Sequence, residues 1–168
     1  MSMPLNICLL TISDSRTLDD DQSGNYLAKS IEAAGHVLYQ RKIVADDKYQ
    51  IRAIVAGWIA DSTVHGIVCT GGTGFTGRDS TPEAILPLLD KQMPGFGELF
   101  RHLSFAQIGT STVQSRAFAG LANAAFVFCL PGSSNACKLA WQEIIQHQLN
   151  SATKPCNLAT LNKRLLEH

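Results

Sequence analysis

The chain has 168 residues, of which 45% are hydrophobic and 17% are charged, and its 14 acidic residues balance its 14 lysines and arginines. A chain of this length can bury enough surface for one well-packed domain. We expect its core over about residues 5–150 and a C-terminal tail over 151–168. Balanced charge excludes a general attraction to nucleic acid or to an acidic membrane, so the expected ligands are small molecules.

The five cysteines are widely spaced and odd in number, and none forms a Cys-x-x-Cys pair. This pattern favours reduced thiols packed in the core over disulfides or a zinc site. The first residues, Met-Ser-Met-Pro-Leu, lack the basic and apolar regions of a signal peptide, and no window approaches eighteen apolar residues. We therefore predict a cytoplasmic protein.

The first half of the chain alternates the patterns of buried strands and amphipathic helices. Residues 5–12 form a nearly continuous apolar run, which is typical of a central parallel strand. A more polar strand is expected at 37–44, either at an edge of the sheet or with a partly exposed face, and apolar residues recur at helical spacing over 49–59. Ser13 and Asp14 follow the first strand, at the end where open α/β sheets bind ligands. They are equally compatible with a simple turn.

A helix is expected between these two strands. Ser23 is its predicted cap, and Gly35 ends it after Ala34. The acidic run at 19–21 favours a solvated loop or charges in the first turn over a metal site. His36 follows the glycine stop, where a lone histidine is usually structural.

Residues 66–83 combine a short buried strand, a glycine-rich loop and the start of a helix. The apolar run at 67–69 is too short for a helix, and the glycines after it permit tight turns and close approach to another group. Free backbone N–H groups at such a junction form a site for an anion. The glycines are Gly71, Gly72, Gly74 and Gly77. At the start of the helix, Ser80 or Thr81 is the expected cap, Pro82 fits the first turn, and Glu83 lies at the positive end of the helix dipole.

Neither common nucleotide motif explains this loop. A P-loop requires a lysine, which the loop lacks. The letters of a dinucleotide fingerprint occur at 72–77, but the strand before them is the third rather than the first. A tight strand-to-helix turn without a ligand is the alternative interpretation.

The second half of the chain repeats the same arrangement. Pro87 is expected to end or kink the helix after the glycine loop, and a helix at 98–105 carries an apolar stripe suited to the core or to a subunit interface. Residues 109–116, which include Ser115 and Arg116, are a plausible second wall of a site. Paired strands at 117–122 and 125–130, joined near Asn123, precede a second turn and helix start, and therefore a second anion site. That turn is Pro131-Gly132-Ser133.

Together these elements predict a three-layer α/β/α domain with a mostly parallel sheet and one antiparallel strand. Arg78 and Arg116 are candidate partners for phosphate, and Asp46 and Asp79 stand at strand ends where they could hold magnesium. Magnesium usually takes one or two protein carboxylates and completes its shell with substrate phosphates and water. No nucleophilic triad is visible, and transfer to a phosphate requires none.

Several motifs, in order, give the chain a family resemblance. They are Thr-Ile-Ser-Asp-Ser at 11–15, Thr-Gly-Gly-Thr-Gly-Phe-Thr-Gly-Arg-Asp-Ser-Thr-Pro-Glu-Ala at 70–84, Met-Pro-Gly-Phe-Gly at 93–97, Ser-Arg at 115–116 and Leu-Pro-Gly-Ser at 130–133. The chain resembles the MoaB/MogA family of molybdenum cofactor biosynthesis proteins, and within it the protein B branch. The resemblance implies a molybdopterin-binding-like fold, a homotrimer or homohexamer, and contacts with other proteins of the pathway.

The resemblance also implies a reaction. Active members of the family adenylylate molybdopterin with Mg-ATP and release pyrophosphate, and Asp46 and Asp79 are the carboxylates implied as catalytic and magnesium-binding. The substrate-binding residues implied by the motifs are Ser13, Asp14, Gly71, Gly72, Thr73, Gly74, Arg78, Ser80, Thr81, Pro82, Glu83, Ser115, Arg116, Pro131, Gly132 and Ser133.

Two other functions remain open from the sequence. The B branch includes members thought to bind or assist without adenylylation, so a non-catalytic molybdopterin-binding or assembly protein is the first alternative. Asn135 stands where related chains often carry a basic residue, and Lys138 is near enough in sequence to replace it. The second alternative is a nucleotide or phosphosugar binder with the same layered fold, because fold alone does not assign function.

Overall fold

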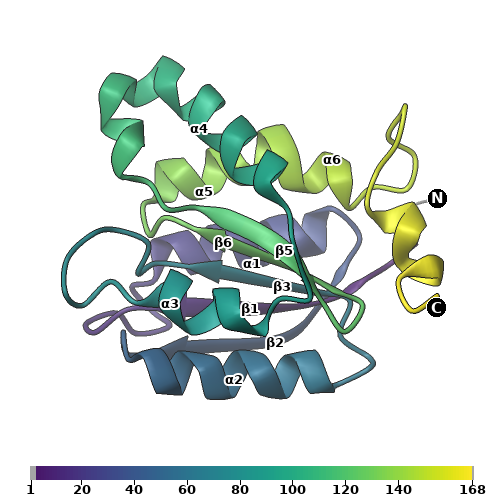
Figure 1. Cartoon of the computed structure of the whole chain (residues 1–168), viewed down its shortest axis with the longest axis horizontal. Coiled ribbons are helices and arrows are strands. Elements are labelled where there is room, and N and C mark those ends of the chain that lie inside the picture. The colour runs from purple at the N-terminus through teal and green to yellow at the C-terminus, as the bar shows by residue number, and fades with distance from the viewer. Residues whose placement is uncertain (1–2, 168) are drawn as a thin grey trace.

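The computed structural model describes residues 3–167, which form a six-stranded sheet with helices on both faces (Figure 1). The strand order is β2-β1-β3-β6-β5-β4. Strands β2, β1, β3 and β6 pair in parallel, whereas β5 is antiparallel to both of its neighbours. This confirms the predicted sheet with its one reversed strand. The strands are β1 (Asn6–Ile12), β2 (Val37–Val44), β3 (Gly66–Thr70), β4 (Lys91–Gln92), β5 (Phe118–Ala122) and β6 (Ala125–Leu130).

The helices form one layer on each face of the sheet. In Figure 1, α4, α5 and α6 lie above the sheet and α2 lies below it, whereas α3 crosses in front of the strands and packs in the same core as α2. Helix α1 packs on the same face as α4 and α5. The α-helices are α1 (Gln22–Ala33), α2 (Lys48–Ala60), α3 (Thr81–Ile85), α4 (Pro94–Ile108), α5 (Ser134–Ala140) and α6 (Gln146–Gln148), with a π-helical segment (Trp141–Ile145) between α5 and α6 and 3-10 helices η1 (Leu86–Leu88), η2 (Gly109–Gln114) and η4 (Ala159–Arg164).

Strand β1 supplies side chains to two separate cores because successive residues of a strand point to opposite faces. Ile7 and Leu9 pack in the core beneath α1, α4 and α5, whereas Cys8 and Leu10 pack in the core against α2. All four are fully buried. The apolar run in the sequence is therefore that of a strand covered on both faces. Burial of a large aliphatic side chain such as Ile7 or Leu9 contributes about 1.5–3 kcal/mol to the free energy of unfolding.

Helix α1 is capped by Asp21, not by the predicted Ser23. Its Oδ1 accepts a hydrogen bond from Gly24 N at 2.9 Å, and its Oδ2 accepts bonds from Thr11 Oγ1 at 2.6 Å and Arg41 Nη2 at 3.1 Å. Asp21 is fully buried. The expectation of a solvated acidic run is therefore wrong for this residue, because the sequence does not reveal that an arginine on β2 faces it.

Two other sequence expectations change, the start of α4 and the burial of one cysteine. Helix α4 begins at Pro94, four residues earlier than predicted, because proline fits the first position of a helix. The tail after residue 150 packs on its own domain, with Ala159 buried in the core. Cys156 is exposed, whereas the other four cysteines are buried as expected, and all five are free thiols. No helix within residues 3–167 is both long and apolar enough to cross a membrane.

His36 makes folding stability dependent on pH. Its ring is buried and its Nδ1 accepts a hydrogen bond from Leu5 N at 3.3 Å, which requires neutral imidazole. Burial lowers the pKa of His36 below its ordinary value. The unfolded chain therefore binds a proton more readily than the folded chain, so the free energy of unfolding should fall as the pH drops through about 6.5. Urea denaturation at pH 5–8 checks this, and H36N, which keeps an acceptor but does not titrate, should show a shallower slope. Equal slopes would contradict this role of His36.

Candidate functional site

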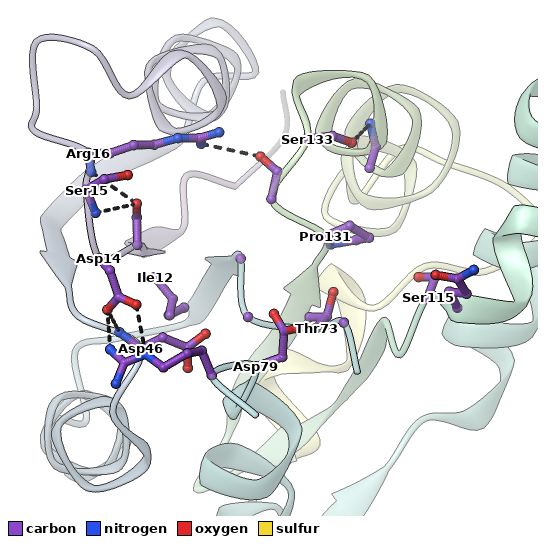
Figure 2. Close-up of a pocket in the computed structure, with 18 of the residues that line it drawn as sticks. Ile12, Asp14, Ser15, Arg16, Asp46, Thr73, Asp79, Ser115, Pro131 and Ser133 are labelled. Carbon is purple, nitrogen blue, oxygen red and sulfur yellow. Dashed lines mark hydrogen bonds and ion pairs between the residues drawn. The ribbon is translucent and has the colours of Figure 1, made fainter. Parts of the chain in front are cut away.

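A cavity of about 600 Å³ lies at the carboxyl ends of β1, β3 and β6 (Figure 2). Strand β2 pairs with one side of β1 and β3 pairs with its other side, so the order of the strands in the sheet reverses at β1. Open α/β sheets bind ligands at such a reversal. Three strand-end loops and one side of α4 and η2 surround it. The lining residues are Ile12, Ser13, Asp14, Ser15, Arg16, Asp46, Gly71, Gly72, Thr73, Gly74, Arg78, Asp79, Phe100, Ser104, Ile108, Gln114, Ser115, Pro131, Gly132, Ser133 and Ala136.

The loop after β3 needs its glycines for physical reasons. Gly71 and Gly72 have φ angles of +105° and +66°, a region that side chains disfavour. A Cβ on Gly71 would lie 2.2 Å from the carbonyl oxygen of Ile12, and one on Gly72 would lie 2.7 Å from Asp46 Oδ2. The loop thus passes directly against β1 and against a candidate catalytic carboxylate.

Asp46 and Asp79 are held on either side of this loop. Asp46 Oδ1 accepts hydrogen bonds from the backbone N and the Oγ of Ser80, at 3.1 and 2.6 Å. Asp79 Oδ2 accepts bonds from the backbone N and the Oγ1 of Thr76, at 2.8 and 2.6 Å. The Thr76 hydroxyl is the main cause that lowers the pKa of Asp79, so this carboxylate is ionised at neutral pH. Both aspartates therefore present fixed oxygens to the cavity.

These two aspartates fit a magnesium ion that is shared with a phosphate ligand. Within residues 3–167, no group of three or more His, Cys, Asp or Glu residues could hold a metal alone. Asp46 Oδ2 accepts no hydrogen bond from those residues, so it is available as a ligand. One or two carboxylates with substrate phosphates and water are what magnesium normally takes.

Arg78 lies at the cavity but already has a partner. Its Nε and Nη2 donate to the two carboxylate oxygens of Asp14, at 3.0 and 2.6 Å, and Asp14 Oδ1 also accepts a bond from Asp46 N at 2.9 Å. The guanidinium lowers the pKa of Asp14 and keeps it ionised. A phosphate would have to compete with Asp14 for Arg78. Because the pair is largely exposed, it holds Arg78 weakly.

Five of the sequence-predicted binding residues support the loop from behind and do not line the cavity: Ser80, Thr81, Pro82, Glu83 and Arg116. Arg116 donates from Nε to the carbonyl oxygen of Gly74 at 2.8 Å and from Nη2 to that of Asp79 at 3.1 Å. Its Nη1 pairs with Glu83, which lowers the pKa of that carboxyl. Arg116 therefore ties both halves of the glycine loop together.

We expect R116Q to loosen the glycine loop. The variant loses charge-assisted hydrogen bonds to the carbonyls of Gly74 and Asp79, which are worth about 1.5–3 kcal/mol when they involve a charged group. Amide hydrogen exchange over residues 73–79 should accelerate by at least tenfold. R101Q is the matched control, because Arg101 binds carbonyls of residues 115 and 117 from α4, outside the loop. Unchanged exchange in R116Q would contradict the clamp.

The loop after β6 lies against the glycine loop. Thr70 Oγ1 donates to the Pro131 carbonyl at 2.9 Å, and Gly71 N donates to that of Leu130 at 3.0 Å. Ser133 caps α5 by accepting a hydrogen bond from Ala136 N at 3.2 Å. Lys138, expected to compensate for Asn135, lies outside the cavity and packs its amine over the ring of Tyr26.

Two parts of the cavity wall were not assigned to the site from the sequence: the face of α4 and Arg16 in the loop after β1. Phe100, Ser104 and Ile108 recur about one helical turn apart, so they face the cavity together. Helical spacing predicted an apolar face here, but not that its edge borders a ligand site. Arg16 directly follows the Ser13-Asp14-Ser15 segment. Its position just after β1 was the only feature of the sequence that could have placed it at the ligand site.

The strand order and a cavity between strand-end loops define an α/β ligand-binding domain built around a glycine-rich loop. Residues 8–151 match the family described as "Probable molybdopterin binding domain". The chain therefore belongs to this family, which confirms the resemblance noted in the sequence.

Relatives and solved structures agree with this family. The chain is 51% identical over 155 residues to molybdenum cofactor biosynthesis protein B of Escherichia coli K12, covering 92% of this chain and 91% of the relative. It is 42% identical over 142 residues to the protein of that name from Bacillus subtilis, covering 84% of each. A crystal structure of molybdenum cofactor biosynthesis protein B matches with a TM-score of 0.88 and 37% identity, covering 98% of this chain and 97% of that one. The tungsten cofactor synthesizing protein MoaB from Pyrococcus furiosus matches with a TM-score of 0.76 and 36% identity, over 84% and 90%.

Proposed function

We propose that the chain acts in molybdenum cofactor biosynthesis by binding molybdopterin and adenylylating it with Mg-ATP. Family membership supports the pathway and the pterin. The observation that carries the reaction is the pair of carboxylates, Asp46 and Asp79, on both sides of a glycine loop within one cavity. Two fixed carboxylates beside a glycine loop suit magnesium-assisted phosphate chemistry.

In the proposed reaction, an oxygen of the molybdopterin phosphate attacks the α-phosphorus of ATP. A new P–O bond forms, the bond from the α-phosphorus to the oxygen that bridges to the β-phosphate breaks, and that oxygen leaves with pyrophosphate. The products are adenylylated molybdopterin and pyrophosphate. Such transfers depend on alignment and charge stabilisation, so the protein does not need to supply a nucleophile.

Each part of the cavity has a role in this proposal. Within residues 3–167, the backbone N–H groups of Gly72 and Thr73 donate no hydrogen bond to protein and would meet phosphate oxygens, because glycine allows close approach, whereas the backbone of Gly74 is engaged by Asp79. Asp46 and Asp79 would hold magnesium, which supplies positive charge to the reacting phosphates when bound. Thr76 and Ser80 keep the two carboxylates in place. Ser13, Ser115 and Ser133 line the walls and are available to orient polar groups of the substrates.

Pyrophosphate release by the purified chain with molybdopterin and Mg-ATP tests the proposal. We expect release that requires all three components and stops when EDTA removes magnesium. Tight molybdopterin binding without pyrophosphate would favour the alternative, a non-catalytic binding or assembly protein. Release with ATP but without molybdopterin would instead indicate a different nucleotide reaction.

A further inference from the structure

Arg16 stands at the end of the cavity opposite the two aspartates. In Figure 2 it reaches across the upper edge toward the loop that carries Ser133, whereas Asp46 and Asp79 lie at the lower edge. Its backbone N donates to Ser13 Oγ at 3.1 Å, a hydroxyl turn that sets the direction of the residue. The cavity therefore has an acidic end and, separately, a basic end.

The positive charge of Arg16 is only partly balanced by its surroundings. The nearest carboxylate is the buried Asp21, whose Oδ1 lies 3.6 Å from Arg16 Nη1 and whose Oδ2 lies 3.1 Å from Arg41 Nη2. No other carboxylate within residues 3–167 pairs with either arginine. The guanidinium groups of Arg16 and Arg41 thus share the single negative charge of Asp21. Arg41 lies closer to that carboxylate, so the charge of Asp21 mainly balances Arg41. The excess positive charge lies on Arg16, at the wall of the cavity.

Arg16 also keeps unused hydrogen-bond donors and is not held by a bidentate carboxylate, as Arg78 is, or by the glycine loop, as Arg116 is. Only its Nη1 makes contacts, at 3.3 Å to the Gly132 carbonyl and 3.4 Å to Ser23 Oγ. Among the described residues, its Nε and Nη2 have no hydrogen-bond acceptor. Arg78 is occupied by Asp14, and Arg116 by the glycine loop.

Ser133 offers a second donor in the loop that Arg16 contacts. Its Oγ accepts from Ala136 N, and within residues 3–167 its hydroxyl donates no hydrogen bond to protein. It follows Gly132, whose carbonyl Arg16 contacts. A guanidinium edge and a hydroxyl that line the same end of a cavity suit a tetrahedral oxyanion, because the planar guanidinium donates two parallel bonds to phosphate.

We propose that Arg16, with Ser133, binds a phosphate group of the ligand at the end of the cavity away from Asp46 and Asp79. This inference rests on the proposed function, because it assigns a specific residue to one of the phosphates that the reaction requires. The phosphate belongs either to molybdopterin or to the nucleotide, and the test separates the two.

The test compares equilibrium binding of four ligands to the wild-type chain and to R16Q: molybdopterin, dephosphorylated molybdopterin, ATP and adenosine. R16Q should weaken binding of one phosphorylated ligand by about 10- to 100-fold and leave its unphosphorylated counterpart unchanged. Loss confined to molybdopterin assigns the pterin phosphate, and loss confined to ATP assigns the nucleotide. R164Q is the control, because it also removes one positive charge, but from an exposed arginine that pairs with Glu167 and does not line the cavity. It should change the affinity for neither molybdopterin nor ATP.

Several results would overturn the inference. Equal affinities of wild type and R16Q for both phosphorylated ligands would do so while leaving the proposed function intact. Equal losses for phosphorylated and unphosphorylated ligands would indicate a structural role for Arg16. If the wild-type chain binds no phosphorylated ligand, the proposed function fails as well. Should R16Q not fold, R16K takes its place, because lysine keeps the charge but lacks the planar donor pair, and a loss of about threefold or more is then expected.

Discussion

Replacing Asp79 by asparagine should lower the rate of pyrophosphate release by about 100- to 1,000-fold, the effect typical of removing one group that stabilises charge in a transition state. Asparagine has the same shape and can still accept the hydrogen bonds of Thr76 through its amide oxygen. It loses the negative charge that would hold magnesium. Molybdopterin binding should therefore survive, and the measurement is a steady-state rate set beside a pterin dissociation constant.

Asp61 provides a matched control for this substitution. Its Oδ1 accepts hydrogen bonds from Thr63 N and Oγ1, at 2.9 and 2.7 Å, so, like Asp79, it is held by the backbone and hydroxyl of one nearby threonine, here two residues after it. The threonine lowers the pKa of Asp61 too, but Asp61 does not line the cavity. D61N should turn over at the wild-type rate. An active D79N that has lost its pterin affinity would contradict the assigned role.

Replacing Gly71 by alanine should destabilise the fold by about 2–5 kcal/mol, since a disfavoured φ angle and a backbone clash each contribute about 1–3 kcal/mol. The added Cβ would lie 2.2 Å from the Ile12 carbonyl oxygen, which cannot move without shifting β1. For a domain of this size, such a loss lowers the melting temperature by roughly 5–15 °C. Calorimetry of the purified variant measures it.

Gly77, in the same loop, is the control for G71A. A Cβ at Gly77 meets no atom within 4 Å, and its φ lies outside the positive range that strains side chains. G77A should change the melting temperature by no more than about 2 °C. If both variants melted alike, the close approach of the glycine loop to β1 would not be what demands a glycine at position 71.

The layered fold could be predicted because its signals are local. The apolar run of β1, the helical spacing over α2 and the reversal at Asn123 each depend on neighbouring residues. At that reversal Asn123 and Ala124 both adopt positive φ, as a two-residue hairpin turn requires. The glycine loop was recognisable for the same reason, since its glycines lie within seven residues of one another.

Side-chain partners in the site could not be predicted because they lie far apart in the chain. Arg116 was expected to contact phosphate, but it binds the carbonyl of Gly74, 42 residues away. Arg16 contacts the carbonyl of Gly132, 116 residues away. The sequence identifies such arginines as cations near a phosphate site. It does not say which of them is already engaged by the protein.

The most direct measurement is a single turnover with ATP labelled at the α-phosphate, excess enzyme and molybdopterin, followed by separation of the products. We predict that label moves into a pterin-AMP adduct in step with pyrophosphate release, and that D79N forms this adduct about 100- to 1,000-fold more slowly. Label that stays in ATP while molybdopterin is bound to the wild-type chain would contradict adenylylation and leave the chain as a molybdopterin-binding protein.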